Sequence, residues 1–205
     1  QLGGIFSRLS GAPMNIVAPI GTITSPTSTI QPSLTASNLS SYTPNIVGDF
    51  PKSTGKVTKI ANGVTYFPGL QQINDPSLAG VSSANGLNGG FSNKAIVDAN
   101  GKLLLVNPAP GEVGNLGLRW IEGPPAFGLD ANLIKRVRIA ETKEFEFRMD
   151  VVGLLNHPVF GLPNTNIDST GSGTTIGPSG TNLAFGRINT AGGNRKITIG
   201  ARLNF

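Results

Sequence analysis

Few residues in this chain could perform chemistry, and their spacing does not favour it. Cysteine is absent and His157 is the only histidine, so the sequence offers no thiolate, no histidine-based metal site and no spare imidazole for a hydrolytic triad. The carboxylates of Glu144, Glu146 and Asp150 alternate with apolar residues and stand near no plausible nucleophile, whereas general acid–base catalysis requires a positioned partner. We therefore expect a non-enzymatic protein with no catalytic residue, no metal and no organic cofactor.

The basic residues do not indicate nucleic-acid binding either. The 16 Lys and Arg outnumber the 11 Asp and Glu, which gives a formal net charge of +5 at pH 7. These cations are scattered and mostly alternate with apolar residues, whereas a nucleic-acid footprint is a clustered basic patch. We expect no nucleic-acid partner.

The composition indicates which type of secondary structure positions the His and acidic residues. Gly (28) and Pro (15) are abundant among the 205 residues, and only 13% of the residues are charged. Gly, Pro, Ser, Thr and Asn replace the missing charge, and they favour strands and turns over helices. A mainly helical protein is therefore excluded, and no apolar run approaches the roughly 18 residues of a transmembrane helix. The chain shows no signal peptide and starts with Gln1, so we expect a processed product or a fragment.

The clearest pattern is an alternation of apolar and polar residues. It covers Glu144–Val151, Lys196–Phe205 and Phe127–Leu133, and Gln1–Ser10 is a weaker fourth case. A period of two over such lengths predicts strands with one apolar and one polar face.

These patterns predict a single all-β unit over 1–205. A strand over 1–10 leads into a long loop region over 11–126, and three long antiparallel strands follow over 127–205. The turn sequences Asn62-Gly63 and Asp98-Ala99-Asn100-Gly101 predict hairpins near 56–67 and 95–106. Within the loop region, 69–90 and 107–125 are expected to be long loops.

Alternating strands of this kind fit two architectures. In a soluble sandwich the apolar face packs on a second sheet, whereas in an outer-membrane barrel it meets lipid and the polar face lines a hydrated lumen. The row of charges from Glu144 to Asp150 favours a hydrated interior. Strands of about 10 to 12 residues also match the roughly 9–11 that cross a membrane at a tilt. We therefore favour antiparallel strands of outer-membrane β-barrel type.

The motifs in these strands resemble a known family. The stretches that carry the resemblance are GNLGLRWIEGPPAFGLDANLIKRVRI (Gly114–Ile139), EFEFRMDVVGLLNHPVFGLPNTNI (Glu144–Ile167), FGRINTAGGNRKITIGARLNF (Phe185–Phe205), QLGGIFSRLSGAPMNIV (Gln1–Val17) and PNIVGD (Pro44–Asp49). They are similar to the C-terminal region of TonB-dependent outer-membrane receptors of the Oar-like, carboxypeptidase-regulatory-domain type. The chain departs from that family at Gly117-Leu118-Arg119, where Gly-Arg-Asn is usual.

The resemblance implies a barrel that imports a bulky substrate with energy from TonB. Such receptors close about 22 strands, so the few strands of this chain cannot close alone. The resemblance also makes 140–143 a short periplasmic turn and 11–126 and 156–195 long extracellular connections, as is typical of these barrels. Phe205, with Leu203, Ala201 and Ile199, is similar to the terminal strand signal that barrel-assembly machinery reads.

Two functions remain open for such a chain. The favoured hypothesis is a structural protein that pairs with copies of itself through β-strand edges and forms a filament-like assembly, either extracellular or in the bacterial envelope. The alternative is the C-terminal portion of an intact TonB-dependent transporter in the outer membrane, whose partners are the rest of the barrel and lipid. In both cases the assembly or lipid-facing positions are expected to be Phe145, Phe147, Met149, Val151, Ile197, Ile199, Leu203 and Phe205.

Overall fold

The computed structural model describes residues 1–18, 43–61, 63–78, 94–108, 114–169 and 184–205. The described residues form β-strands and one short 3-10 helix, η1 (Pro76–Leu78). All strand pairs are antiparallel, which confirms the predicted all-β, antiparallel fold. No helix in the described part of the chain has the length and apolarity to cross a membrane.

The contacts divide the chain into two compact units where the sequence predicts one. The first, called here the long-strand unit, contains Gln1–Gly11, Pro125–Gly161 and Thr190–Phe205. The second, the small-sheet unit, contains Ala12–Pro124 and Leu162–Asn189. Both units are built from strands.

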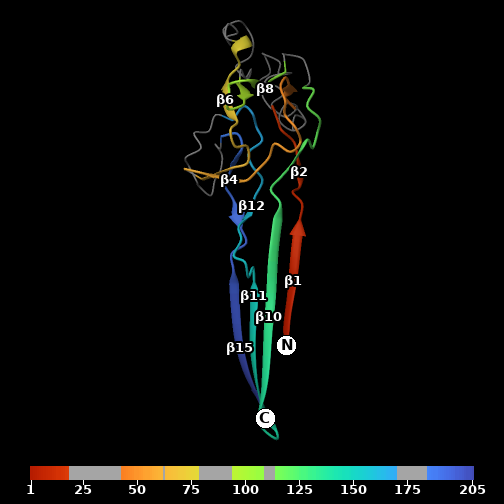
Figure 1. The fold of residues 1–205 in the computed structure, drawn as a ribbon, viewed down its shortest axis with the longest axis vertical. Coiled ribbons are helices and arrows are strands. Elements are labelled where there is room, and N and C mark those ends of the chain that lie inside the picture. Colours follow the sequence, from red (N-terminus) through yellow and green to blue (C-terminus); the bar gives the residue numbers. More distant parts are fainter. Residues whose placement is uncertain (19–42, 62, 79–93, 109–113, 170–183) are drawn as a thin grey trace, which may run out of the picture. The chain divides into compact units, whose positions relative to one another are not determined.

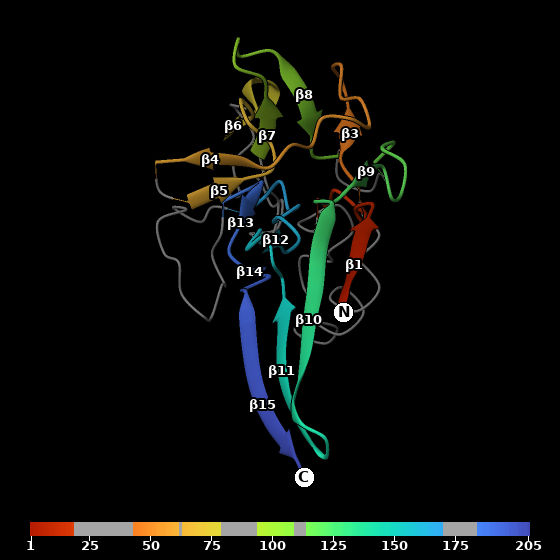
Figure 2. The same ribbon diagram turned by 60° about the horizontal axis from the view of Figure 1, so that its bottom comes forward.

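The long-strand unit contains a four-stranded sheet in the order β1-β10-β11-β15. Its strands are β1 (Leu2–Leu9), β10 (Ala126–Ala140), β11 (Lys143–Val152) and β15 (Lys196–Asn204). They lie side by side in Figure 1 and Figure 2. A two-stranded pair of β12 (Val159–Phe160) and β14 (Ala191–Gly192) completes this unit.

The register of the four strands aligns their alternating patterns. Leu133 of β10 lies opposite Leu2 of β1 on one side and Met149 of β11 on the other. Met149 in turn lies opposite Ile199 of β15. Because side chains alternate between the faces of a strand, this register places most apolar positions of the four strands on one face, whereas Ile5, Leu9, Ile134 and Val152 lie on the other.

The small-sheet unit occupies much of the region that the sequence predicts as loop. Its strands are β2 (Pro13–Met14), β3 (Asn45–Ile46), β4 (Thr58–Ile60), β5 (Gly63–Thr65), β6 (Gln71–Asn74), β7 (Lys94–Val97), β8 (Leu103–Val106), β9 (Ile121–Glu122) and β13 (Arg187–Ile188). They form sheets in the orders β3-β8-β7-β6, β13-β5-β4 and β2-β9. Strands β4 and β5, and β7 and β8, lie where the two hairpins are expected. Strand β6, which pairs with β7, falls in a segment for which the sequence predicts only loop.

The small-sheet unit has its own apolar core. The largest fully buried apolar side chains of this unit are Phe50, Ile16, Ile96, Leu105, Ile121 and Ile167. The indole Nε1 of Trp120 donates a hydrogen bond to the carbonyl oxygen of Phe50 at 2.9 Å. The ring of Phe67 stacks on that of Phe185, with centroids 4.9 Å apart.

Candidate functional site on the two faces of the long sheet

One face of the long-strand sheet, called here the apolar face, collects the residues that the sequence singles out. Strand β11 contributes Phe145, Phe147, Met149 and Val151, and β15 contributes Ile197, Ile199 and Leu203. Cross-strand pairs are Phe145 with Leu203, Met149 with Ile199 and Val151 with Ile197. Phe205 follows the end of β15, where Lys143 Nζ lies 5.5 Å from its ring centroid. The structure therefore brings the predicted positions together on two neighbouring strands.

Strands β1 and β10 extend the apolar face beyond the predicted residues. Their contributions are Leu2, Gly4 and Phe6 from β1, and Phe127, Leu129, Ala131, Leu133 and Val137 from β10. The signal for the β10 residues was present in the alternation over Phe127–Leu133. The signal for β1 was weaker, because its apolar residues Leu2, Ile5, Phe6 and Leu9 do not keep a strict period of two.

The apolar face has no second layer packed on it among the described residues. Val151 is the one apolar residue of the long-strand unit that is buried to the level of the small-sheet core. By contrast, Leu2 is 78% exposed and Ile199 is 64% exposed. Large apolar side chains of a soluble sandwich would be covered by the facing sheet. A contiguous exposed apolar surface of this kind marks a site of contact with protein or membrane.

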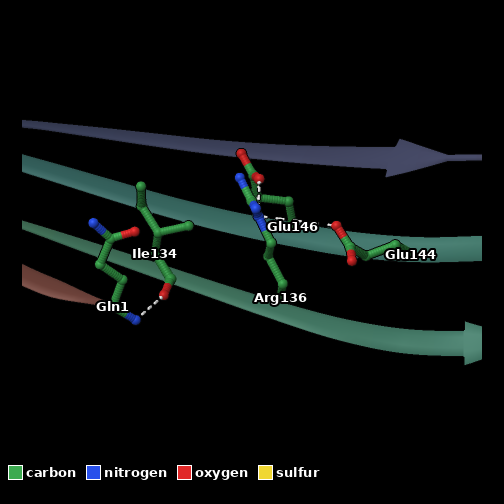
Figure 3. A network of polar contacts seen from close by, with 5 residues as sticks. All are labelled: Gln1, Ile134, Arg136, Glu144 and Glu146. Atoms are coloured by element: carbon green, nitrogen blue, oxygen red, sulfur yellow. Dashed lines mark hydrogen bonds and ion pairs between the residues drawn. The ribbon is translucent and has the colours of Figure 1, made fainter.

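The opposite face, called here the polar face, carries charges of both signs. Arg136 Nε donates to Glu146 Oε2 at 2.6 Å and lies 3.9 Å from Glu144 Oε1 (Figure 3). Arg148 Nε donates to Asp150 Oδ2 at 2.7 Å. The two arginine side chains are more than half exposed. These ion pairs stabilise the sheet little, because water screens them, and they make the face a hydrated surface of mixed charge.

Both outer strands have one edge that pairs with nothing in the described part of the chain. Strand β1 pairs with β10 alone, and β15 pairs with β11 alone. Gln1 and Ile134 extend the β1–β10 ladder by exchanging two main-chain hydrogen bonds of 2.8 and 2.9 Å, the first of which is drawn in Figure 3. The outer edges therefore present main-chain N–H and C=O groups to a further strand.

The residues capable of chemistry do not converge in the structure. The described residues contain no group of three or more His, Cys, Asp or Glu side chains arranged to hold a metal ion. The His157 ring packs against Phe127, with ring centroids 3.9 Å apart. The absence of enzymatic activity and of cofactors stays a prediction.

A comparison with protein families gives a match that covers almost the whole chain. A family model described as an outer membrane beta barrel domain matches residues 1–198. Neither the curated proteins nor the solved structures contain a significant match.

Proposed function

Because the chain belongs to the outer membrane β-barrel domain family, we propose that its long-strand sheet is a segment of the wall of a transport barrel. The family places the protein in the outer membrane. In the proposed barrel, the apolar face meets lipid and the polar face lines a hydrated interior, as is general for such barrels.

The observation that carries this proposal is the difference between the two faces of a single uncovered sheet. On one face, Ile197 and Ile199 are both more than half exposed. On the other, Glu146 and Asp150 form ion pairs with arginines that are more than half exposed. A sheet of this kind is stable only where its apolar face meets an apolar medium and its polar face meets water. A membrane barrel provides both, with lipid outside and water inside.

The strand lengths and connections agree with this placement. Strand β11 has 10 residues and β15 has 9, and a tilted strand crosses a membrane in about 9–11 residues. The link between β10 and β11 is a two-residue turn, Glu141–Thr142. Most of the small-sheet unit belongs to the long connections between β1 and β10 and between β11 and β15. Short turns are periplasmic and long connections are extracellular in these barrels, so we assign the small-sheet unit to the outside of the cell.

Four strands cannot form a closed barrel. An open edge cannot stay in lipid, because its N–H and C=O groups have no partner there. In our proposal, further strands of one ring pair with the outer edges of β1 and β15. The similarity of Gly114–Ile139 and Glu144–Ile167 to Oar-like TonB-dependent receptors supports a ring of about 22 strands and the energised import of a bulky substrate.

A second candidate function rests on the same two edges. Strand β1 of one copy can pair with β15 of another, and the even number of strands keeps the order antiparallel. Repetition of that head-to-tail contact would give a filament rather than a closed ring. In this case the apolar face would be covered by protein instead of lipid.

Single cysteines can distinguish the two functions, because the chain contains no cysteine of its own. Ile199→Cys and the matched control Thr198→Cys put a fluorophore on opposite faces of β15. In vesicles that contain spin-labelled lipid, the barrel predicts strong quenching at position 199 and weak quenching at position 198. Equal and weak quenching at both positions, with filaments in electron micrographs, would overturn the barrel and support assembly.

A further inference from the structure

The polar face of the long-strand sheet carries charges of both signs, whereas the apolar face carries cations only. All four carboxylates within the strands, Asp130, Glu144, Glu146 and Asp150, lie on the polar face. The charges that share the alternation of the apolar face are Arg8, Lys135 and Lys143, which are all cationic. A surface that combines exposed apolar side chains with cations alone is complementary to a phase that is apolar inside and anionic at its boundary.

The position of Lys135 agrees with such a boundary. Arg8 lies opposite Phe127 of β10, and Lys135 lies eight residues further along the same strand. At about 3.4 Å per residue and a tilt of about 40°, this separation spans roughly 21 Å across the membrane. The apolar band of an outer-membrane barrel is about 25 Å tall, and long cationic side chains extend outward to make up the difference.

The rungs between Arg8 and Lys135 carry only apolar side chains on this face. In order, they are Phe6–Leu129, Gly4–Ala131–Val151–Ile197 and Leu2–Leu133–Met149–Ile199. Lys135 lies opposite Phe147, and Lys143 lies beside the Phe205 ring. None of the ion pairs among the described residues includes Lys135 or Lys143.

We propose that Lys135 and Lys143 bind the phosphate of an anionic phospholipid in the leaflet at the hairpin end of β10 and β11. This inference rests on the proposed barrel, because it requires lipid on the apolar face. Lys135 lies four residues from the level of Lys143, which is about 13 Å along the strand. Long lysine side chains at a membrane boundary extend towards water, which in the proposed barrel would carry the Lys135 ammonium towards the hairpin and shorten this gap. The four strand carboxylates do not compete for these ammonium groups, because they lie on the other face. Glu141, in the turn beside Lys143, forms no ion pair with either lysine among the described residues.

The test measures which lipid stays on the protein. The purified protein is equilibrated with vesicles of phosphatidylcholine and phosphatidylglycerol, and native mass spectrometry gives the ratio of the two retained lipids. The variants are Lys135→Gln, Lys143→Gln and their combination. Lys196→Gln is the matched control, because it removes the same charge from the polar face of β15. Circular dichroism verifies that each variant keeps its β-structure.

We expect the wild type to retain phosphatidylglycerol preferentially. Each apolar-face substitution should lower that preference about five-fold, since one lysine near an anionic surface contributes on that scale. Lys135→Arg should preserve the preference, and Lys196→Gln should leave it unchanged. A double variant with the wild-type preference would overturn the lipid site.

A separate measurement distinguishes this failure from failure of the barrel. A fluorophore on Leu133→Cys lies one rung inside Lys135 on the apolar face. If spin-labelled lipid quenches it while the double variant keeps its preference, the barrel stands and the lipid site is wrong. If lipid does not quench it, the barrel assignment fails and the lipid site fails with it.

Discussion

Val151 of β11 lies directly opposite Ile197 of β15, and the two side chains share the apolar face. Val151 is 4% exposed, whereas Ile197 is 53% exposed. Strand β11 has neighbours on both sides, and β15 pairs on one side only within the described residues. The exposed residue of this pair, Ile197, therefore marks the edge of the sheet where a further strand must pair with β15 or lipid must cover the apolar face.

Our first prediction concerns a charge at this pair. Ile197→Arg should destabilise the protein in vesicles by about 2–4 kcal/mol, because its rung lies near the middle of the proposed apolar band and arginine on the lipid face is costly there. Thr198→Arg, on the hydrated face of the same strand, should have little effect. Denaturant unfolding in vesicles measures both. Equal destabilisation by the two substitutions would contradict the assignment of faces.

A second prediction concerns the ion pair of Arg136 and Glu146. Although the pair is close at 2.6 Å, the Arg136 side chain is 62% exposed. Water and salt therefore screen the attraction. Glu146→Gln should reduce the unfolding free energy only slightly at low salt and not at all at high salt. A large loss that persists at high salt would show that this face is not hydrated.

A third prediction concerns the pH dependence of the small-sheet unit. Burial raises the pKa of Tyr66 above its ordinary value of 10.0, and the charge of Glu122 adds to the increase. The folded state therefore keeps the phenol proton at pH values where the unfolded state loses it. The stability that results is complete below pH 10.0 and is lost as the pH rises through the raised pKa.

Tyr66→Phe provides the measurement for this pH dependence. The tyrosine hydroxyl donates to the carbonyl oxygen of Glu122 at 2.6 Å, so the variant should be less stable at neutral pH by about 1 kcal/mol. The difference should shrink as the pH rises above 10.0. Denaturant unfolding at neutral and alkaline pH tests this, and parallel curves for the two proteins would contradict it.

A fourth prediction concerns the close packing at Gly114. A Cβ atom at this position would overlap the main-chain carbonyl oxygen of Thr43. Because the obstacle is backbone, Gly114→Ala should destabilise the small-sheet unit by about 1–3 kcal/mol. Gly200→Ala is the control, since a Cβ there meets no atom within 4 Å. Thermal unfolding compares them, and an unchanged Gly114→Ala protein would contradict the packing at this site.

The long strands were predictable because a period of two that is sustained over many residues fits a strand and does not fit a helix. Strand β11 at Lys143–Val152 contains the predicted run Glu144–Val151, and β15 at Lys196–Asn204 agrees with Lys196–Phe205 to one residue. By contrast, β6 has four residues and β2 has two. So short a strand shows no period, and only its tertiary partner defines it. The small-sheet unit was therefore predicted only at its two hairpins.

The apolar face was predictable only in part, for a related reason. The residues of β11 and β15 follow from their own alternation. The contribution of Leu2 depends on its pairing with Leu133, and contacts so distant in sequence leave no local pattern. The proposed role of Lys135 could not be predicted for the same reason, because the register of β10 against β11 defines the neighbours of this residue on the apolar face.

The central claim is that the long-strand sheet belongs to the wall of one closed outer-membrane barrel. Cryo-electron microscopy of the protein extracted from outer membranes tests this most directly. Our account predicts a single ring in which the outer edges of β1 and β15 are both paired and Ile199 points towards the surrounding detergent or lipid. A filament in which β15 of one copy pairs with β1 of the next, or a second sheet packed over Ile199, would contradict it.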